Sequence, residues 1–183
     1  MEKLNKLRRR LKQNPIEASA PCRVDVGGTL DIAPFLYPLY RYSPCTFNIA
    51  IDLSTRVRLS AYRDDMVKIT SRGFEPSAFP AGQAPFDHPL GLMFAITTHF
   101  GVSGLHVDIE STSPPRSALG GSSVAAVALV AALQTAILNE PPVVDAAFRK
   151  QVALLAHALE ESVAGVPCGK QCPWRELAMT PQG

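Results

Sequence analysis

Pro114-Pro115-Arg116-Ser117-Ala118-Leu119-Gly120-Gly121-Ser122-Ser123 lies between a predicted strand and a long predicted helix. Its small residues let the backbone approach an anion closely, and the first N–H groups of a helix point toward such an anion. Ser122 and Ser123 add hydroxyls for a phosphate or a metal ion. The segment is not a Walker loop, because no Gly-Lys-Ser/Thr follows. From chemistry alone, a plain glycine loop with a serine N-cap explains it equally well.

Hydrophobic periodicity puts most strands early in the chain and most helices late. The pattern predicts helices over 3–13, His88–Phe100, Ser122–Asn139 and Val144–Ala164. It predicts strands over Ile16–Val26, 46–62, Val67–Thr70 and Gly104–Glu110. The Asp64-Asp65 turn predicts a hairpin between the second and third of these strands, and residues 72–87, rich in glycine and proline, are predicted to form a loop. This order indicates the α+β class rather than a strict βαβ repeat.

The composition is that of an ordinary globular protein. The chain has 183 residues, of which 46% are hydrophobic and 19% charged, enough for one compact domain with a sizeable core. A net charge of +2 is too small to argue for a nucleic acid or a membrane surface as partner. Basic residues do concentrate in the first predicted helix, which we interpret as a solvated helix in preference to a nucleic-acid arm. No apolar run reaches the length of a membrane span.

The cysteines argue for a reducing compartment. The spacing of Cys22, Cys45, Cys168 and Cys172 lacks the close pairs that a zinc site requires. We expect reduced thiols and a cytoplasmic protein.

A second segment, Ala20–Asp31, contains residues suited to a small polar ligand. It places Arg23, Asp25 and Asp31 around a glycine turn at the end of a strand. Such a cluster could hold the hydroxyls of a sugar and counter the charge of a phosphate. Taken alone, a surface turn with an ion pair is the simpler interpretation.

A third segment places carboxylates at the end of an apolar helix. Glu160 and Glu161 come shortly before the turn Gly165–Gln171. Magnesium ions in proteins prefer one or two carboxylates together with phosphate oxygens, so a carboxylate here could reach such an ion. Taken alone, a solvated helix end is again the simpler interpretation.

In this order and spacing, the three segments resemble the GHMP kinase superfamily, which includes galactokinase, homoserine kinase and mevalonate kinase. The likeness runs from about residue 16 to residue 171. It is nearest to the sugar-kinase branch with the heptose phosphate kinases and L-fucose kinase, where Cys-Gly-Lys-Gln-Asp is typical. The resemblance implies the family's two-lobed α+β fold, of which this chain would hold the N-terminal lobe, with its ribosomal-protein-like fold, and lack the C-terminal lobe.

The resemblance also implies a function and site residues. The function would be magnesium-dependent transfer of the γ-phosphate of ATP to a hydroxyl of a sugar or sugar phosphate. Arg23, Asp25 and Asp31 would lie near the sugar, and Ser122 and Glu160 would bind the metal. The ATP phosphates would be held by Pro115, Ser117, Ala118, Leu119, Gly120, Gly121, Ser122 and Ser123.

The sequence departs from the family pattern in several places. Ala118 replaces a usual glycine, and Gly121 stands where a serine is usual. Cys172 stands where relatives carry the aspartate that orients or deprotonates the attacking hydroxyl, and a neutral thiol is a poor substitute for a carboxylate. On this pattern no catalytic residue is intact.

These departures lead us to expect three parts: a basic helix over 1–15, the ATP-binding domain over 16–171 and an aberrant tail over 172–183. A frameshift or premature stop after Gln171 is the simplest expectation, and a short regulatory protein is the alternative. A truncated lobe would expose apolar surface near Val152–Ala164 and in the tail, and could self-associate. Three functions stay open: an active kinase, a kinase remnant that at most binds nucleotide, and an unrelated anion-binding domain.

Overall fold

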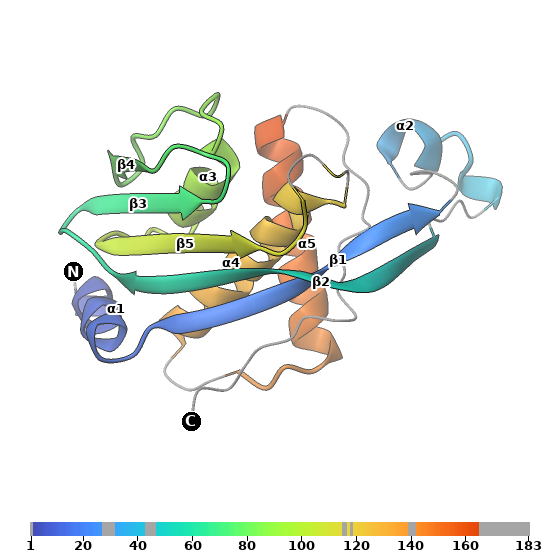
Figure 1. Cartoon of the computed structure of the whole chain (residues 1–183). Helices are drawn as coiled ribbons and strands as arrows, with labels where there is room; N and C mark the ends of the chain where they lie inside the picture. The colour runs from blue at the N-terminus through green and yellow to red at the C-terminus, as the bar shows by residue number, and fades with distance from the viewer. Residues whose placement is uncertain are drawn as a thin grey trace.

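A mixed five-stranded sheet forms the frame of the molecule (Figure 1). The computed structural model describes residues 2–26, 32–42, 47–114, 117, 119–138 and 142–164. In the sheet order β1-β2-β5-β3-β4, only the central β5–β3 pair is parallel. The strands are β1 Ile16–Val26, β2 Phe47–Ala61, β3 Met66–Ser71, β4 Ser77–Pro80 and β5 Leu105–Ser111.

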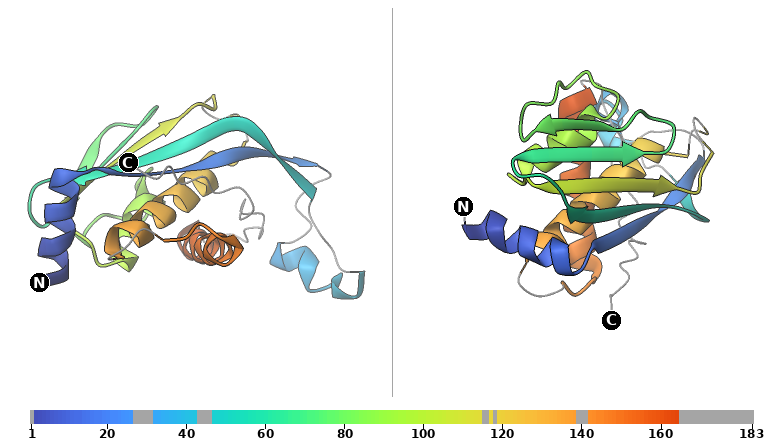
Figure 2. Two further views of the ribbon diagram at one scale, coloured as in Figure 1. Left: turned by 90° about the horizontal axis from the view of Figure 1, so that it is seen from below. Right: turned by 60° about the vertical axis from the view of Figure 1, so that its left-hand side comes forward.

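The helices of the core cover one face of this sheet, as Figure 2 shows. Helix α4 packs against β1 and β2 on one side and against α5 on the other. The predicted α+β class is confirmed, and the predicted elements agree with the observed ones to within a few residues, apart from the two corrections below. The helices are α1 Glu2–Gln13, α2 Ala33–Leu36, the 3₁₀ turn η1 Tyr40–Tyr42, α3 Gly91–His99, α4 Gly121–Ile137 and α5 Ala146–Ala164.

Burial explains the two hydrophobic patterns. Strand residues alternate between the core and the open face, and Val57, Leu59 and Val107 point inward with no exposed surface. Helix α4 instead is apolar all round, and Val124–Leu133 are buried without a polar stripe. A helix enclosed by a sheet on one side and a helix on the other has no face for water, so its sequence needs no amphipathic period.

The predicted hairpin between residues 46–62 and Val67–Thr70 is wrong. Strand β5 lies between β2 and β3, antiparallel to the first and parallel to the second. The Asp64-Asp65 turn does connect β2 to β3, and Asp65 has a positive φ of 56°. The central position buries both edges of β5 as well as its apolar face, where Leu105 and Val107 have no exposed surface. Local turn chemistry cannot report this preference, because it comes from residues forty positions away.

The loop predicted over residues 72–87 contains a strand that the sequence did not reveal. Strand β4, Ser77–Pro80, pairs with β3 at the edge of the sheet. Proline is tolerated at an edge because it has no N–H to donate to a neighbouring strand. The same prolines that predict a loop therefore also suit a short edge strand.

Helix α1 is attached to the core through both its apolar and its basic residues. Leu7 and Leu11 are buried, whereas Arg9 and Lys12 face solvent. Arg10 reaches the C-terminal end of α4. Its Nη1 donates to the carbonyl oxygens of Thr135 at 3.1 Å, Ala136 at 3.4 Å and Leu138. Those carbonyls end α4, where a cation offsets the negative end of the helix dipole. The basic helix that was predicted to be solvated is thus also attached to α4 through Arg10.

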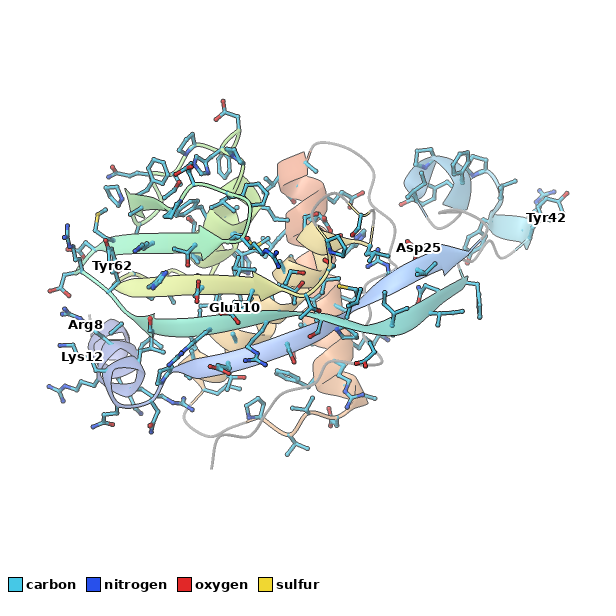
Figure 3. All side chains as sticks on the ribbon, in the orientation of Figure 1. Arg8, Lys12, Asp25, Tyr42, Tyr62 and Glu110 are labelled. Carbon is cyan, nitrogen blue, oxygen red and sulfur yellow. The ribbon has the colours of Figure 1, made fainter. Side chains whose placement is uncertain are left out.

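The open face of the sheet holds rows of paired polar residues. Figure 3 views this face, with Tyr62 and Glu110 labelled. One row runs across four strands: Arg58 lies 3.5 Å from Glu17 and opposite Asp108, to which Thr70 donates a hydrogen bond. His106 Nε2 lies 2.9 Å from Thr70 Oγ1. The single hydrogen of Thr70 goes to Asp108, so His106 Nε2 donates to Thr70.

Of the two places predicted to expose apolar surface, the tail lies outside the described residues, and α5 exposes little. On α5, Val152, Ala153 and Ala156 are buried against the core and Leu154 is half-exposed. The larger exposed group lies where β1 and β2 extend past the rest of the sheet and on the neighbouring α2–η1 segment, whose Tyr42 is labelled in Figure 3. Its members are Val24, Phe35, Tyr37, Leu39, Tyr40, Tyr42, Phe47 and Ile49. Within the described part of the chain, no helix is both long and apolar enough to cross a membrane.

Replacing Arg10 should weaken the fold. Arg10→Ala removes a charged donor from the last carbonyls of α4, and we expect the free energy of unfolding to fall by about 1–2 kcal/mol. Arg9→Ala, one residue away and exposed, is the matched control and should change it by less than about 0.5 kcal/mol. Urea unfolding of both variants measures the difference. Equal losses would show that Arg10 is an ordinary surface residue.

The pH dependence of stability should contain a component from His106. Burial, and after it the charge of Lys68, lowers the pKa of His106 below its ordinary value of 6.5, while Asp108 opposes the shift. As the pH falls below about 6.5, the unfolded chain therefore binds this proton before the folded chain does, and stability decreases until the pH passes the folded-state pKa. His106→Gln keeps a donor for Thr70 but does not titrate. Urea unfolding between about pH 7 and pH 5 should show a smaller loss of stability in this variant, and identical pH profiles would contradict the assignment.

Candidate functional site

The glycine loop ends in a left-handed residue at the start of α4. Gly120 is the N-cap, with φ 72° and ψ 28°, and no side chain caps the helix there. The predicted alternative of a serine N-cap is therefore wrong: Ser122 and Ser123 lie inside the first turn. A left-handed conformation is costly for residues with a Cβ, which explains a glycine at this position. The first-turn N–H groups have no partners within the helix and define an anion-binding end.

The serines of this turn meet the carboxylate that the sequence analysis proposed. Ser122 Oγ donates to Glu160 Oε1 at 3.2 Å, and Ser123 Oγ donates to the same oxygen at 2.9 Å. Glu160 comes from α5, so these bonds join two helices across 37 residues of chain. The neighbouring Glu161 takes no part, and its Oε2 lies 3.9 Å from His157 Nε2. The structure thus distinguishes the two glutamates: Glu160 contacts the loop and Glu161 contacts His157, a difference that the sequence does not show.

Arg23 of β1 lies against the glycine loop. A Cβ added to Gly120 would be 3.4 Å from Arg23 Nη1 and 3.5 Å from its Cζ. Arg23 is buried, although the alternation along β1 would turn it outward after buried Cys22. A register shift between Pro21 and Arg23 changes the direction of the strand and puts both residues inside. A guanidinium group therefore stands next to the anion-binding end of α4.

Asp25 belongs to the same group of charges. Arg23 Nε donates to Asp25 Oδ1 at 3.2 Å, and Figure 3 shows Asp25 toward the end of β1. The Asp25 side chain keeps 29% of its surface exposed, against 9% for Arg23. The ion pair of the simpler interpretation is therefore present, but its arginine is buried beside the loop rather than on the surface. Of the predicted substrate residues, Asp31 lies outside the described residues, as do Pro115, Ala118 and Cys172 of the other predicted groups.

A cavity of about 400 Å³ opens beside the loop. The loop and α4 line one side of it with Ser117, Leu119, Gly121 and Ser122. The remaining walls come from four other places, namely the turn after β3, the start of α3, the end of β5 and one residue of β2. They contribute, among others, Arg72, Phe74, Leu92, Met93, Ile109, Ser111, Ser113 and Thr55.

Sequence analysis missed this cavity. Its walls come from segments that are up to about seventy residues apart, and apart from the glycine loop none of them carries a motif. One signal was available: Ser111-Thr112-Ser113 directly precedes the loop and could have been expected to share its surroundings. The aromatic side chain of Phe74, which is 48% exposed, had no such signal.

The arrangement is polarised. At one end stand the N-terminus of α4, the Arg23 guanidinium and a carboxylate held by two hydroxyls. At the other end the cavity is lined largely by apolar side chains. Such a site suits a ligand that has an anionic part and a flat or apolar part. Among the described residues, no group of three or more His, Cys, Asp or Glu side chains is placed to hold a metal ion.

Comparison with known proteins finds a family match for the second half of this domain. The family model described as "GHMP kinases N terminal domain" matches residues 89–173. This range begins at α3 and contains the glycine loop, α4 and α5. No curated protein matches the chain in sequence.

Solved structures share the fold over most of this chain. The D-glycero-D-manno-heptose 1-phosphate kinase of Bacteroides thetaiotaomicron is 15% identical with a TM-score of 0.64, over 92% of this chain and 60% of that one. The mevalonate kinase of Methanococcus jannaschii is 12% identical with a TM-score of 0.67, over 89% and 52%. The galactokinase of Lactococcus lactis, complexed with galactose, is 18% identical with a TM-score of 0.63, over 92% and 43%.

At these identities the likeness concerns the fold, and the chain spans 43% to 60% of the length of the three solved proteins. The matched fold confirms the predicted N-terminal lobe. The chain therefore shares the fold of these kinases, and its residues 89–173, with the glycine loop, match the N-terminal domain of the GHMP kinases.

Proposed function

We propose that this chain binds ATP with magnesium and serves the transfer of the γ-phosphate to a hydroxyl of a sugar or sugar phosphate. The observation that carries the proposal is the meeting of Ser122, Ser123 and Glu160 at the N-terminus of α4, beside Arg23. Phosphoryl transfer depends mainly on positioning and on charge stabilisation. A helix N-terminus, a guanidinium and a magnesium-binding carboxylate are the groups that this task requires.

In this proposal the phosphates of ATP lie on the loop. The backbone N–H groups at the start of α4 would bind the phosphate oxygens, and the left-handed Gly120 lets the chain approach them closely. Pro115, Ser117 and Ala118 are proposed to extend the phosphate site toward the start of the loop. Arg23 adds a positive charge next to Gly120, where a guanidinium can pair with phosphate oxygens.

Ser122 and Glu160 are the proposed magnesium ligands. Their oxygens already lie 3.2 Å apart, and a hydroxyl and a carboxylate are oxygen donors of the kind magnesium prefers. Magnesium usually takes one or two protein carboxylates and completes its shell with water and phosphate oxygens, so a single glutamate suffices. The bound ion would offset the repulsion between Glu160 and the phosphates.

The cavity is the proposed place of the nucleoside. Its volume of about 400 Å³ lies within the usual range of small-molecule sites. Phe74, Leu92 and Met93 line it, and the half-exposed ring of Phe74 offers a surface on which a base can stack. The cavity is continuous with Gly121 and Ser122, so one nucleotide can reach both ends of the site.

The acceptor side of the proposal rests on fewer described residues. Arg23, Asp25 and Asp31 are the proposed contacts to the acceptor, and solved proteins of the same fold are named for a heptose 1-phosphate, galactose and mevalonate. We favour a sugar or sugar phosphate because carboxylates bind hydroxyls well and Arg23 can counter a phosphate. The proposed acceptor is therefore a small metabolite of the cytoplasm.

The transfer step is proposed separately from ATP binding. Residue 172 is where the resemblance places the aspartate that orients the acceptor hydroxyl, and Cys172 stands there. A thiol with an ordinary pKa of about 8.5 stays protonated at neutral pH and is a weak base. The alternative function is therefore a domain that binds nucleotide with little or no turnover. ATP consumption with a panel of hexoses and heptose phosphates decides between the two.

Substitution of Gly120 should weaken ATP binding. In Gly120→Ala the new Cβ lies 3.4 Å from Arg23 Nη1 and the residue keeps a positive φ, so the loop or the arginine must move. We expect the affinity for magnesium-ATP to fall by about tenfold, which equals about 1.4 kcal/mol. Isothermal titration calorimetry measures it.

Gly101→Ala is the matched control for this experiment. Gly101 also has a positive φ, with nothing within 4 Å of an added Cβ, and it follows the end of α3 that is remote from the cavity. It should cost similar backbone strain without changing ATP affinity. If both variants bind ATP like the unsubstituted protein, the loop has only a structural role.

Glu160→Gln should remove the magnesium dependence of ATP binding. The amide keeps an oxygen that accepts from Ser122 and Ser123 but lacks the charge that binds the ion. We expect the ratio of ATP affinities with magnesium and with EDTA to shrink by about tenfold or more. Glu161→Gln, whose side chain faces His157, should keep the ratio unchanged. An unchanged ratio in Glu160→Gln would remove this residue from the proposed metal site.

A further inference from the structure

Three hydroxyl side chains form a chain on the wall of the cavity. Thr55 comes from β2, Ser111 ends β5 and Ser113 follows it, and all three line the cavity. Thr55 is 1% exposed and Ser113 is 8% exposed. Apolar Ile109 and Leu119 line the same cavity. Buried hydroxyls in such surroundings need partners, because an unmet hydrogen-bonding group costs about 1–3 kcal/mol.

The hydrogen bonds of Ser111 fix the direction of this chain. Thr55 Oγ1 donates to Ser111 Oγ at 3.0 Å, and the backbone N–H of Ser113 donates to the same oxygen at 3.3 Å. A hydroxyl oxygen accepts two hydrogen bonds and donates one. Both acceptor positions of Ser111 are therefore taken, and its hydrogen goes to Ser113 Oγ, which lies 2.8 Å away.

Ser113 is consequently the last hydroxyl in this row of hydrogen bonds, and its own hydrogen is left to donate. Its Oγ accepts from Ser111, and no acceptor for its O–H is found among the described residues. Hydrogen bonds in series polarise one another, so Thr55 and Ser111 make the final hydroxyl a better donor. Because Ser113 lines the cavity, an acceptor atom on a molecule in the cavity can complete this hydrogen bond.

We propose that Ser113 donates this hydrogen bond to an acceptor atom of the bound nucleoside and so helps to select which nucleotide the cavity takes. The inference rests on the proposed binding of ATP. A purine base offers ring nitrogens, and its ribose offers oxygens, and both are acceptors of the required kind. Thr55 and Ser111 then act as positioning residues, which orient Ser113 without touching the ligand.

Nucleotide analogues with single missing acceptors test the proposal. The probes are magnesium-ATP, its 1-deaza, 3-deaza and 7-deaza analogues, and 2′-deoxy-ATP and 3′-deoxy-ATP. We expect one of these analogues to bind the unsubstituted full chain about fivefold to tenfold more weakly than ATP, as the loss of one hydrogen bond predicts. In Ser113→Ala the same analogue and ATP should bind equally. A deaza analogue would identify a ring nitrogen as the partner, and a deoxy analogue would identify a ribose oxygen.

Thr112→Val is the matched control. Thr112 is exposed, and its hydroxyl pairs with the backbone of Ser54, accepting from its N–H at 2.9 Å and donating to its carbonyl at 3.2 Å. This variant should keep the discrimination of the unsubstituted protein. If Ser113→Ala does not fold, as judged by circular dichroism, Ser113→Cys keeps the side-chain size with a weak donor and should reduce the discrimination in the same direction.

The outcomes separate the two proposals. If the unsubstituted chain binds ATP but every analogue keeps the same affinity ratio to ATP in the Ser113 variants, the role of Ser113 is overturned while the proposed function stands. If the unsubstituted chain binds no ATP, the proposed function itself fails.

Discussion

The enclosure of α4 between the sheet and α5 is the constraint on which the rest of the structure depends. Buried on all sides over Val124–Leu133, this helix cannot shift along its axis without exposing apolar surface or opening a cavity. Its alanines let the sheet and α5 approach closely. The position of its N-terminus is therefore fixed by packing, and everything that meets this N-terminus is held by the core.

The candidate site is assembled around that fixed end from distant parts of the chain. A register shift in β1 turns Arg23 inward against Gly120, and α5 brings Glu160 to the first-turn serines. The end of β5 leads directly into the loop and supplies Ser111 and Ser113 to the cavity. Because each contributor is itself packed on α4 or on the sheet, the site needs no separate stabilisation.

Sequence reasoning succeeded where the signal was local. Helices α4 and α5 lie in continuous apolar segments, and the predicted ranges of both agree with the structure to within a few residues. It failed for the order of the strands, because whether β3 pairs with β2 or with β5 depends on which arrangement buries Leu105 and Val107. The inward direction of the Arg23 side chain could not be predicted either. A β-bulge changes the side-chain alternation, and nothing in Pro21-Cys22-Arg23 indicates a bulge. The cavity could not be predicted either, because its walls come from five separate places in the chain and no sequence pattern links them.

The charges of the site argue that a nucleotide would enter with its cation. Among the described residues, Glu160 and Asp25 are the carboxylates that contact the first turn of α4 and Arg23, against the Arg23 guanidinium and the helix N-terminus. Asp25 already engages Arg23, so the positive charge left for several phosphate groups is small. Glu160, which accepts hydrogen bonds from Ser122 and Ser123 of that first turn, would repel bare phosphates, and this repulsion weakens little in a partly buried site. A divalent cation between Glu160 and the phosphates reverses the sign of that interaction. The same carboxylate that would oppose free ATP would then favour the magnesium complex, which gives a physical reason for a glutamate at a site proposed to hold an anion.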